Sequence, residues 1–173
     1  MIGMLRTRRS HAVVSGLLLL LLGAWGALVP FIGPYFHYSY TPSTTWTYNT
    51  DRLWLEILPG GAAFLGGLLL ILPVQRVLAM FGALLAAAAG AWFALGTLLS
   101  PLWNHNVAMG GSPVGSPHRQ IVEQVGFFTG LGIVIVFLAA VALGRIAALP
   151  SLAGATPAPT LPIDETQPTE PVA

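Results

Sequence analysis

Two carboxylates interrupt apolar stretches of this sequence, and each follows an arginine by four residues. Arg52 precedes Glu56 in the stretch RLWLEILPGG, and Arg119 precedes Glu123 in RQIVE. Residues at positions i and i+4 share one face of a helix, so each pair can form an ion pair. Ionisable residues within membrane spans are rare, and many of them mark ion or proton pathways. These four residues are therefore the candidate site of the chain.

Two interpretations of these pairs stay open. In the first, each arginine extends toward water while holding its carboxylate, and the pair fixes the depth of a helix at the membrane interface. In the second, the carboxylates carry ion or proton chemistry. Pro59 supports this second reading, because a proline kink can frame a cavity. Glu56 and Glu123 could also face each other and share a proton or a cation. The pattern favours the first interpretation.

Composition excludes several classes of function. Of the 173 residues, 55% are hydrophobic and only 8% are charged, which is too few for the surface of a soluble domain. The net charge of +1 and the absence of a basic patch argue against nucleic acid. There is no cysteine, phosphate loop or cofactor fingerprint, so we expect no enzyme and no cofactor. His37, His105, His118 and Asp51 fit no closed-site spacing, so we expect no metal.

Four apolar runs are long enough to cross a bilayer, which requires roughly 20 residues of helix. They lie near residues 12–32, 53–72, 77–99 and 121–143. Lipid satisfies no backbone hydrogen bonds, so the runs predict an all-α, four-transmembrane-helix bundle over residues 1–145. Residues 146–173 are rich in proline and threonine, which predicts a disordered cytoplasmic tail.

The arginines predict the orientation. Five of them fall on one side of the predicted spans: Arg6, Arg8, Arg9, Arg76 and Arg145. Only Arg52 and Arg119 fall on the other side. The positive-inside rule then predicts a multi-pass protein of the cytoplasmic membrane with both termini in the cytoplasm. The loops 33–52 and 100–120 would face outward.

The chain also contains an apparent tandem repeat. GAWGAL starts at Gly23 and GAWFAL at Gly90, an offset of 67 residues. The same offset aligns four further pairs: Arg9 with Arg76, Pro34 with Pro101, Arg52 with Arg119, and Glu56 with Glu123. We interpret this as a duplicated two-helix unit with a pseudo-two-fold axis along the membrane normal. The alternative is convergence of two apolar hairpins.

Aromatic residues alternate with polar ones in the first outer loop. They are Phe36, Tyr38, Tyr40, Trp46 and Tyr48. Period-two alternation around a Thr-Pro-Ser turn predicts a short β-hairpin or an aromatic loop. Its aromatic face would pack on the bundle or the lipid headgroups, or bind a partner. These five residues are the candidate partner surface.

The segments GPYFHYSY, TDRLWLEILPGGAAFLGG and GAWFALG resemble small four-helix membrane proteins of actinobacteria, a family without an assigned activity. The resemblance implies the topology and carries over no catalytic residue. The first functional hypothesis is an accessory or structural component of the cytoplasmic membrane, whose partners are the lipid bilayer and another membrane protein or a second copy. The alternatives are a small transporter or channel component using Glu56 and Glu123, and a membrane sensor with an extracytoplasmic aromatic loop.

Overall fold

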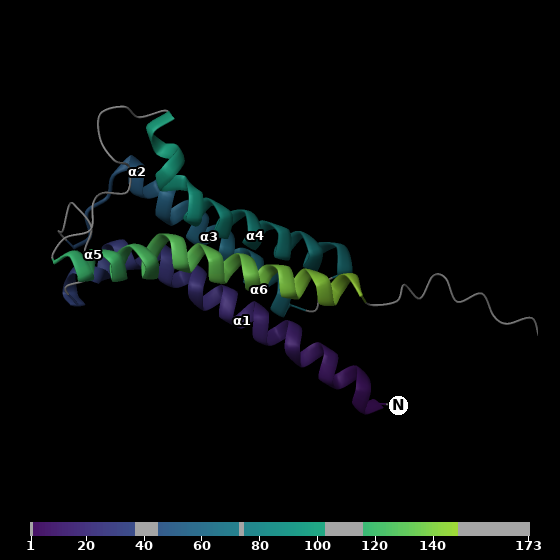
Figure 1. Ribbon diagram of the computed structural model, residues 1–173. Helices are drawn as coiled ribbons and strands as arrows, with labels where there is room; N and C mark the ends of the chain where they lie inside the picture. Colours follow the sequence, from purple (N-terminus) through teal and green to yellow (C-terminus); the bar gives the residue numbers. More distant parts are fainter. Residues whose placement is uncertain (1, 37–44, 73–74, 103–115, 149–173) are drawn as a thin grey trace, which may run out of the picture.

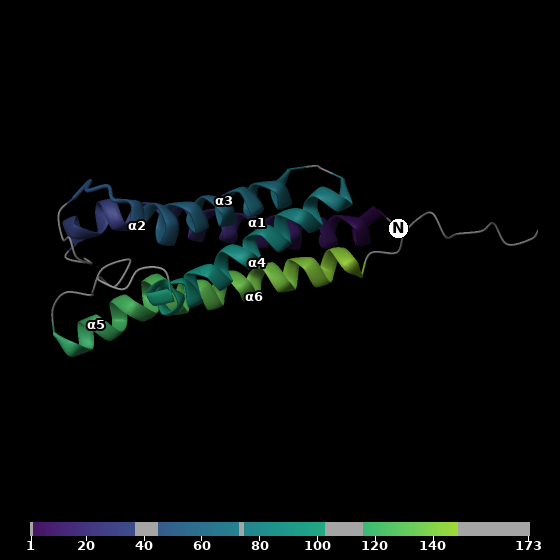
Figure 2. The same cartoon turned by 90° about the horizontal axis from the view of Figure 1, so that it is seen from above.

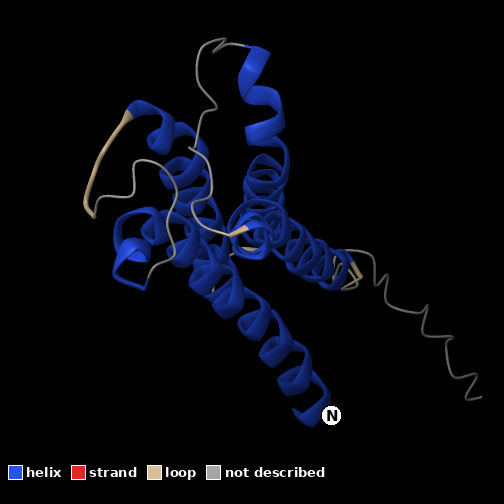
Figure 3. Ribbon diagram, turned by 60° about the vertical axis from the view of Figure 1, so that its left-hand side comes forward, coloured by secondary structure: helices blue, strands red, loops and turns tan. Residues whose placement is uncertain are grey.

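The described residues form 4 long helical rods, which lie side by side (Figure 1). The computed structural model describes residues 2–36, 45–72, 75–102 and 116–148. No strand occurs within these ranges (Figure 3). Phe36 ends a short 3-10 helix and residues 45–49 form turn and coil, so the described ends of the predicted hairpin are not strands. Tyr38, Tyr40 and the predicted tail beyond residue 148 lie outside the described residues.

Each rod contains one predicted span. The first comprises α1 (Ile2–Ile32) and η1 (Gly33–Phe36). The second comprises α2 (Thr50–Arg52), the π-helical turn η2 (Leu53–Ile57) and α3 (Leu58–Ile71). The third comprises α4 (Arg76–Leu99) and η3 (Ser100–Leu102). The fourth comprises α5 (Pro117–Gln124), the π-helical turn η4 (Val125–Thr129) and α6 (Gly130–Ala147). All 4 rods are long and apolar enough to cross a membrane, as predicted.

The rods form a ring in which α1 packs on α3, α3 on α4, α4 on α6, and α6 loosely back on α1. Figure 2 shows α1 and α3 in one layer, with α4 crossing obliquely toward α6. The start of α1, the end of α3, the start of α4 and the end of α6 lie at the same end of the bundle (Figure 1). We call this the inner end, after the predicted orientation, and the opposite end the outer end. Arg76 Nη2 donates to Ala147 O at 2.9 Å and ties α4 to α6 at the inner end.

Glycines allow the helices to approach closely where they cross. A Cβ atom on Gly23 of α1 would lie 2.7 Å from Gly60 O of α3, and one on Gly66 of α3 would lie 2.5 Å from Gly82 O of α4. A Cβ atom on Gly90 of α4 would lie 2.8 Å from the carbonyl oxygen of Gly132 in α6. All these distances are too short for a real side chain. In lipid, where burial of apolar surface does not drive helices together, such close backbone packing stabilises the bundle.

Candidate functional site

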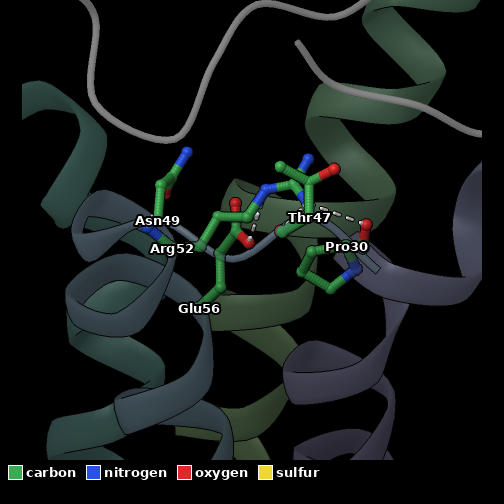
Figure 4. A network of polar contacts seen from close by, with 5 residues as sticks. All are labelled: Pro30, Thr47, Asn49, Arg52 and Glu56. Atoms are coloured by element: carbon green, nitrogen blue, oxygen red, sulfur yellow. Dashed lines mark hydrogen bonds and ion pairs between the residues drawn. The ribbon is translucent and has the colours of Figure 1, made fainter. Parts of the chain in front are cut away.

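Arg52 is buried at the outer end and joins three segments (Figure 4). Its Nη1 donates to Thr47 O at 2.7 Å and to Pro30 O, near the end of α1, at 3.2 Å. Its backbone N–H donates to Asn49 Oδ1 at 2.7 Å, which caps the start of α2. The side chain is only 2% exposed. The prediction that this arginine extends to water is therefore wrong, because its guanidinium donates hydrogen bonds to backbone carbonyls inside the protein.

The carbonyl of Pro30 needs a donor because of the residue four positions further on. In an α-helix, Pro30 O would accept from the N–H of residue 34. That residue is Pro34, which has no N–H. A buried carbonyl without a donor costs about 1–3 kcal/mol. Arg52 supplies the missing donor from another rod, so the proline explains the position of the arginine.

Glu56 lies one turn further along the second rod and is completely buried. Its Oε2 is 4.0 Å from Arg52 Nε, so the i,i+4 ion pair exists but is longer than a hydrogen bond. Among the described residues, neither of its oxygens accepts a hydrogen bond. This wide separation is consistent with Arg52 Nη1 pointing to Thr47 and Pro30. Glu56 is thus a buried carboxylate that accepts no hydrogen bond from the described part of the chain.

The pair of Arg119 and Glu123 matches the predicted interfacial anchor better than the first pair does. Arg119 Nε donates to Glu123 Oε1 at 3.0 Å. The arginine side chain is 43% exposed, whereas that of the glutamate is 1% exposed. Here the arginine extends outward from a buried carboxylate, as predicted for both pairs.

A serine accounts for part of the difference between the two arginines. Thr97 O occupies the place of Pro30 O in the 67-residue register, and Pro101 likewise removes its helical donor. Ser100, which is buried, donates its hydroxyl to Thr97 O at 2.8 Å. The register places Gly33, which has no side-chain donor, opposite Ser100. The first unit therefore recruits an arginine where the second uses a neighbouring hydroxyl.

A third carbonyl without a helical donor lies in η2. The N–H of Leu58 bonds to Leu53 O, five residues back, instead of Trp54 O. The next possible donor to Trp54 O is residue 59, which is a proline. Trp92 Nε1 of α4 donates to Trp54 O at 2.9 Å instead. Sequence reasoning missed this contact, because tryptophans near span ends are also explained by interfacial belts.

The two glutamates lie at different depths along their helices. Gly60 packs against Ala27, and Gly132 packs against Ala94, which is the counterpart of Ala27 in the 67-residue register. Glu56 precedes Gly60 by four residues, but Glu123 precedes Gly132 by nine. At 1.5 Å of rise per residue, the five extra residues place Glu123 about 7 Å further out. This difference in depth argues against the hypothesis that the two carboxylates face each other.

The described aromatic residues of the candidate partner surface are exposed. Phe36, Trp46 and Tyr48 all expose more than half of their side-chain area. Trp46 adopts φ 57°, a strained value for a residue with a side chain, and its ring lies 5.8 Å from that of Phe31. These three exposed residues are called the outer aromatic surface below.

No metal site and no known relative adds to this picture. Within the described ranges, no group of three or more His, Asp or Glu side chains could hold a metal ion. His37 and His105 lie outside the described residues. No family model, curated protein or solved structure matches the chain. The function must therefore be argued from the geometry.

Proposed function

We propose that this protein is an accessory component of the cytoplasmic membrane that presents the outer aromatic surface to another membrane protein. The observation that carries the proposal is the exposure of Phe36, Trp46 and Tyr48, the last two on either side of Thr47, whose carbonyl accepts from the buried Arg52. Aromatic side chains with few rotatable bonds dominate the binding energy of many protein interfaces.

The backbone is anchored at two positions directly after Trp46. Thr47 O accepts from the buried Arg52, and Asn49 caps α2. Strained backbone persists where the surroundings over-determine it, and such positions cluster at functional sites. An anchored segment loses little conformational entropy on binding, which favours affinity. The arginine and its carbonyl contacts thus support the aromatic surface from below.

The proposed architecture is a tandem repeat with both termini in the cytoplasm. Two paired crossings support the duplication, since Gly23 meets Gly60 as Gly90 meets Gly132. Equivalent residues are 67 positions apart in the first helix of each unit, as with Gly23 and Gly90. They are 72 positions apart in the second helix, as with Gly60 and Gly132. A five-residue insertion between Glu123 and Gly132 accounts for the difference.

A photo-crosslinking residue placed at position 46 or 48 in native membranes tests the proposed function. We expect one defined membrane protein to be captured from both positions, and its co-purification with the full chain to be lost on Trp46→Ala. The matched control is the same probe at Phe137, an exposed aromatic of α6, which should capture lipid instead. Lipid adducts alone from positions 46 and 48 would contradict the proposal.

Glu56 favours a second candidate function, in which the protein is a small transporter or channel component. A carboxylate that is buried and accepts no hydrogen bond from a described residue is suited to binding a proton or a cation. Reconstituted liposomes would measure proton and sodium flux for the unmodified chain, Glu56→Gln and Glu123→Gln. Flux that falls only in the first variant supports this function. Flux equal to that of empty liposomes rules it out.

A further inference from the structure

The two copies of the repeated hexapeptide differ at a single position, and the two residues at that position meet inside the bundle. GAWGAL has Gly26 where GAWFAL has Phe93. Phe93 is fully buried, and a Cβ atom on Gly26 would lie 2.6 Å from its Cζ atom. The ring of α4 therefore occupies the space that a side chain on α1 would need.

A contact between equivalent residues locates an axis. In a two-fold arrangement, a residue touches its own counterpart only where the axis passes between them. The contact of Gly26 with Phe93 places the pseudo-two-fold axis between α1 and α4 at this level. Two phenylalanines at the axis would collide, and two glycines would leave a void. One large and one small residue fill the space.

The surroundings of this contact are alike in the two units. Gly23 and Gly90, three residues before the axis position, pack on Gly60 and Gly132 in corresponding ways. The second helix of each unit is therefore held by the same type of crossing. The difference between Gly26 and Phe93 therefore lies between two similar crossings, where α1 of one unit meets α4 of the other.

We propose that the α1–α3 unit and the α4–α6 unit recognise each other as binding partners, and that Gly26 and Phe93 determine which units pair. The ring of one unit fills the hollow of the other, so unlike units fit and like units do not. The proposal rests on the duplicated architecture proposed above and is independent of the outer aromatic surface.

Exchanging the two residues in the full chain tests the proposal. Gly26→Phe and Phe93→Gly should each lower the Tm in detergent by about 5 °C or more, by overpacking and by a cavity respectively. The double variant should regain at least half of the summed loss, because the ring then fills the same space from α1. Gly61→Phe and Phe137→Gly are matched controls, because a Cβ on Gly61 meets nothing within 4 Å and Phe137 is exposed.

A milder cycle covers the case in which the large changes prevent folding. Gly26→Ala should lower the Tm, and Phe93→Leu should reduce that loss by at least half, because the shorter side chain withdraws from the new methyl group. Additive losses in both cycles would overturn the proposal. Crosslinking from position 46 reports the outer aromatic surface separately, so failure of either proposal can be distinguished from failure of the other.

Discussion

The Nη1 atom of Arg52 lies 3.2 Å from Pro30 O, the carbonyl that Pro34 leaves without its helical donor. The same relationship recurs twice at the outer end. Trp92 bonds to Trp54 O beside Pro59, and Ser100 bonds to Thr97 O before Pro101. Each proline removes a backbone donor, and a side chain replaces it. Two of these replacements come from another rod, so prolines that weaken single helices also connect neighbouring ones.

Replacing Arg52 with lysine should destabilise the protein more than the same change at Arg119. A single ammonium group cannot reproduce the contacts of the guanidinium with Thr47 O, Pro30 O and the Glu56 carboxylate. We expect Arg52→Lys to cost about 2 kcal/mol, from two lost hydrogen bonds, and Arg119→Lys to cost about 1 kcal/mol or less. Thermal unfolding in detergent measures both variants. Equal Tm values would show that the buried contacts of Arg52 contribute little.

Trp92→Phe should destabilise the bundle by leaving Trp54 O without a donor. The change keeps an aromatic ring in place and removes only the indole N–H, so the expected cost is about 1–3 kcal/mol. Trp54→Phe is the control, because the accepting atom of residue 54 is its backbone oxygen and survives the change. The expected order of Tm values is Trp92→Phe below Trp54→Phe. The reverse order would assign the stabilisation to the ring of Trp54.

Much of the fold could be predicted because lipid permits few structures. Apolar runs of about 20 residues must be helices in a bilayer, and the structure confirms four of them. The spacing of Arg119 and Glu123 likewise predicted an ion pair, since it depends only on the geometry of one helix. Features that depend on a single rod were therefore accessible from the sequence.

The burial of Arg52 could not be predicted in the same way. It depends on Pro34 removing a donor, on Gly33 lacking a hydroxyl, and on the first two rods being adjacent at the outer end. Only the first two are visible in the sequence, and the third is a tertiary contact. The difference in depth between Glu56 and Glu123 could not be predicted either, because an ungapped 67-residue offset aligns the two residues with each other. That difference became visible when Gly60 and Gly132 were placed at equivalent crossings.

Single cysteines should report the orientation of the chain in the membrane. The protein has no cysteine of its own, so His118→Cys and Arg145→Cys each create one thiol at an exposed position. On intact cells, a membrane-impermeant maleimide should label the first variant but not the second. Both should be labelled after the membrane is opened. Labelling of position 145 alone on intact cells would reverse the predicted orientation.

A double-mutant cycle between Pro34 and Arg52 tests whether the proline makes the arginine necessary. Pro34→Ala restores an N–H four residues after Pro30, so Pro30 O can be satisfied within its own helix. The cost of Arg52→Lys should then fall by about 1 kcal/mol, the usual value of one hydrogen bond.

Arg119→Lys in the same Pro34→Ala background serves as the control, because Arg119 belongs to the second unit. Its cost should be the same with either residue at position 34, since well-separated sites change stability additively. If the costs at positions 34 and 52 were also additive, Arg52 would stabilise the outer end through Thr47 and Glu56 alone. A smaller combined cost would show that the missing N–H of Pro34 is what draws the guanidinium of Arg52 to the end of α1.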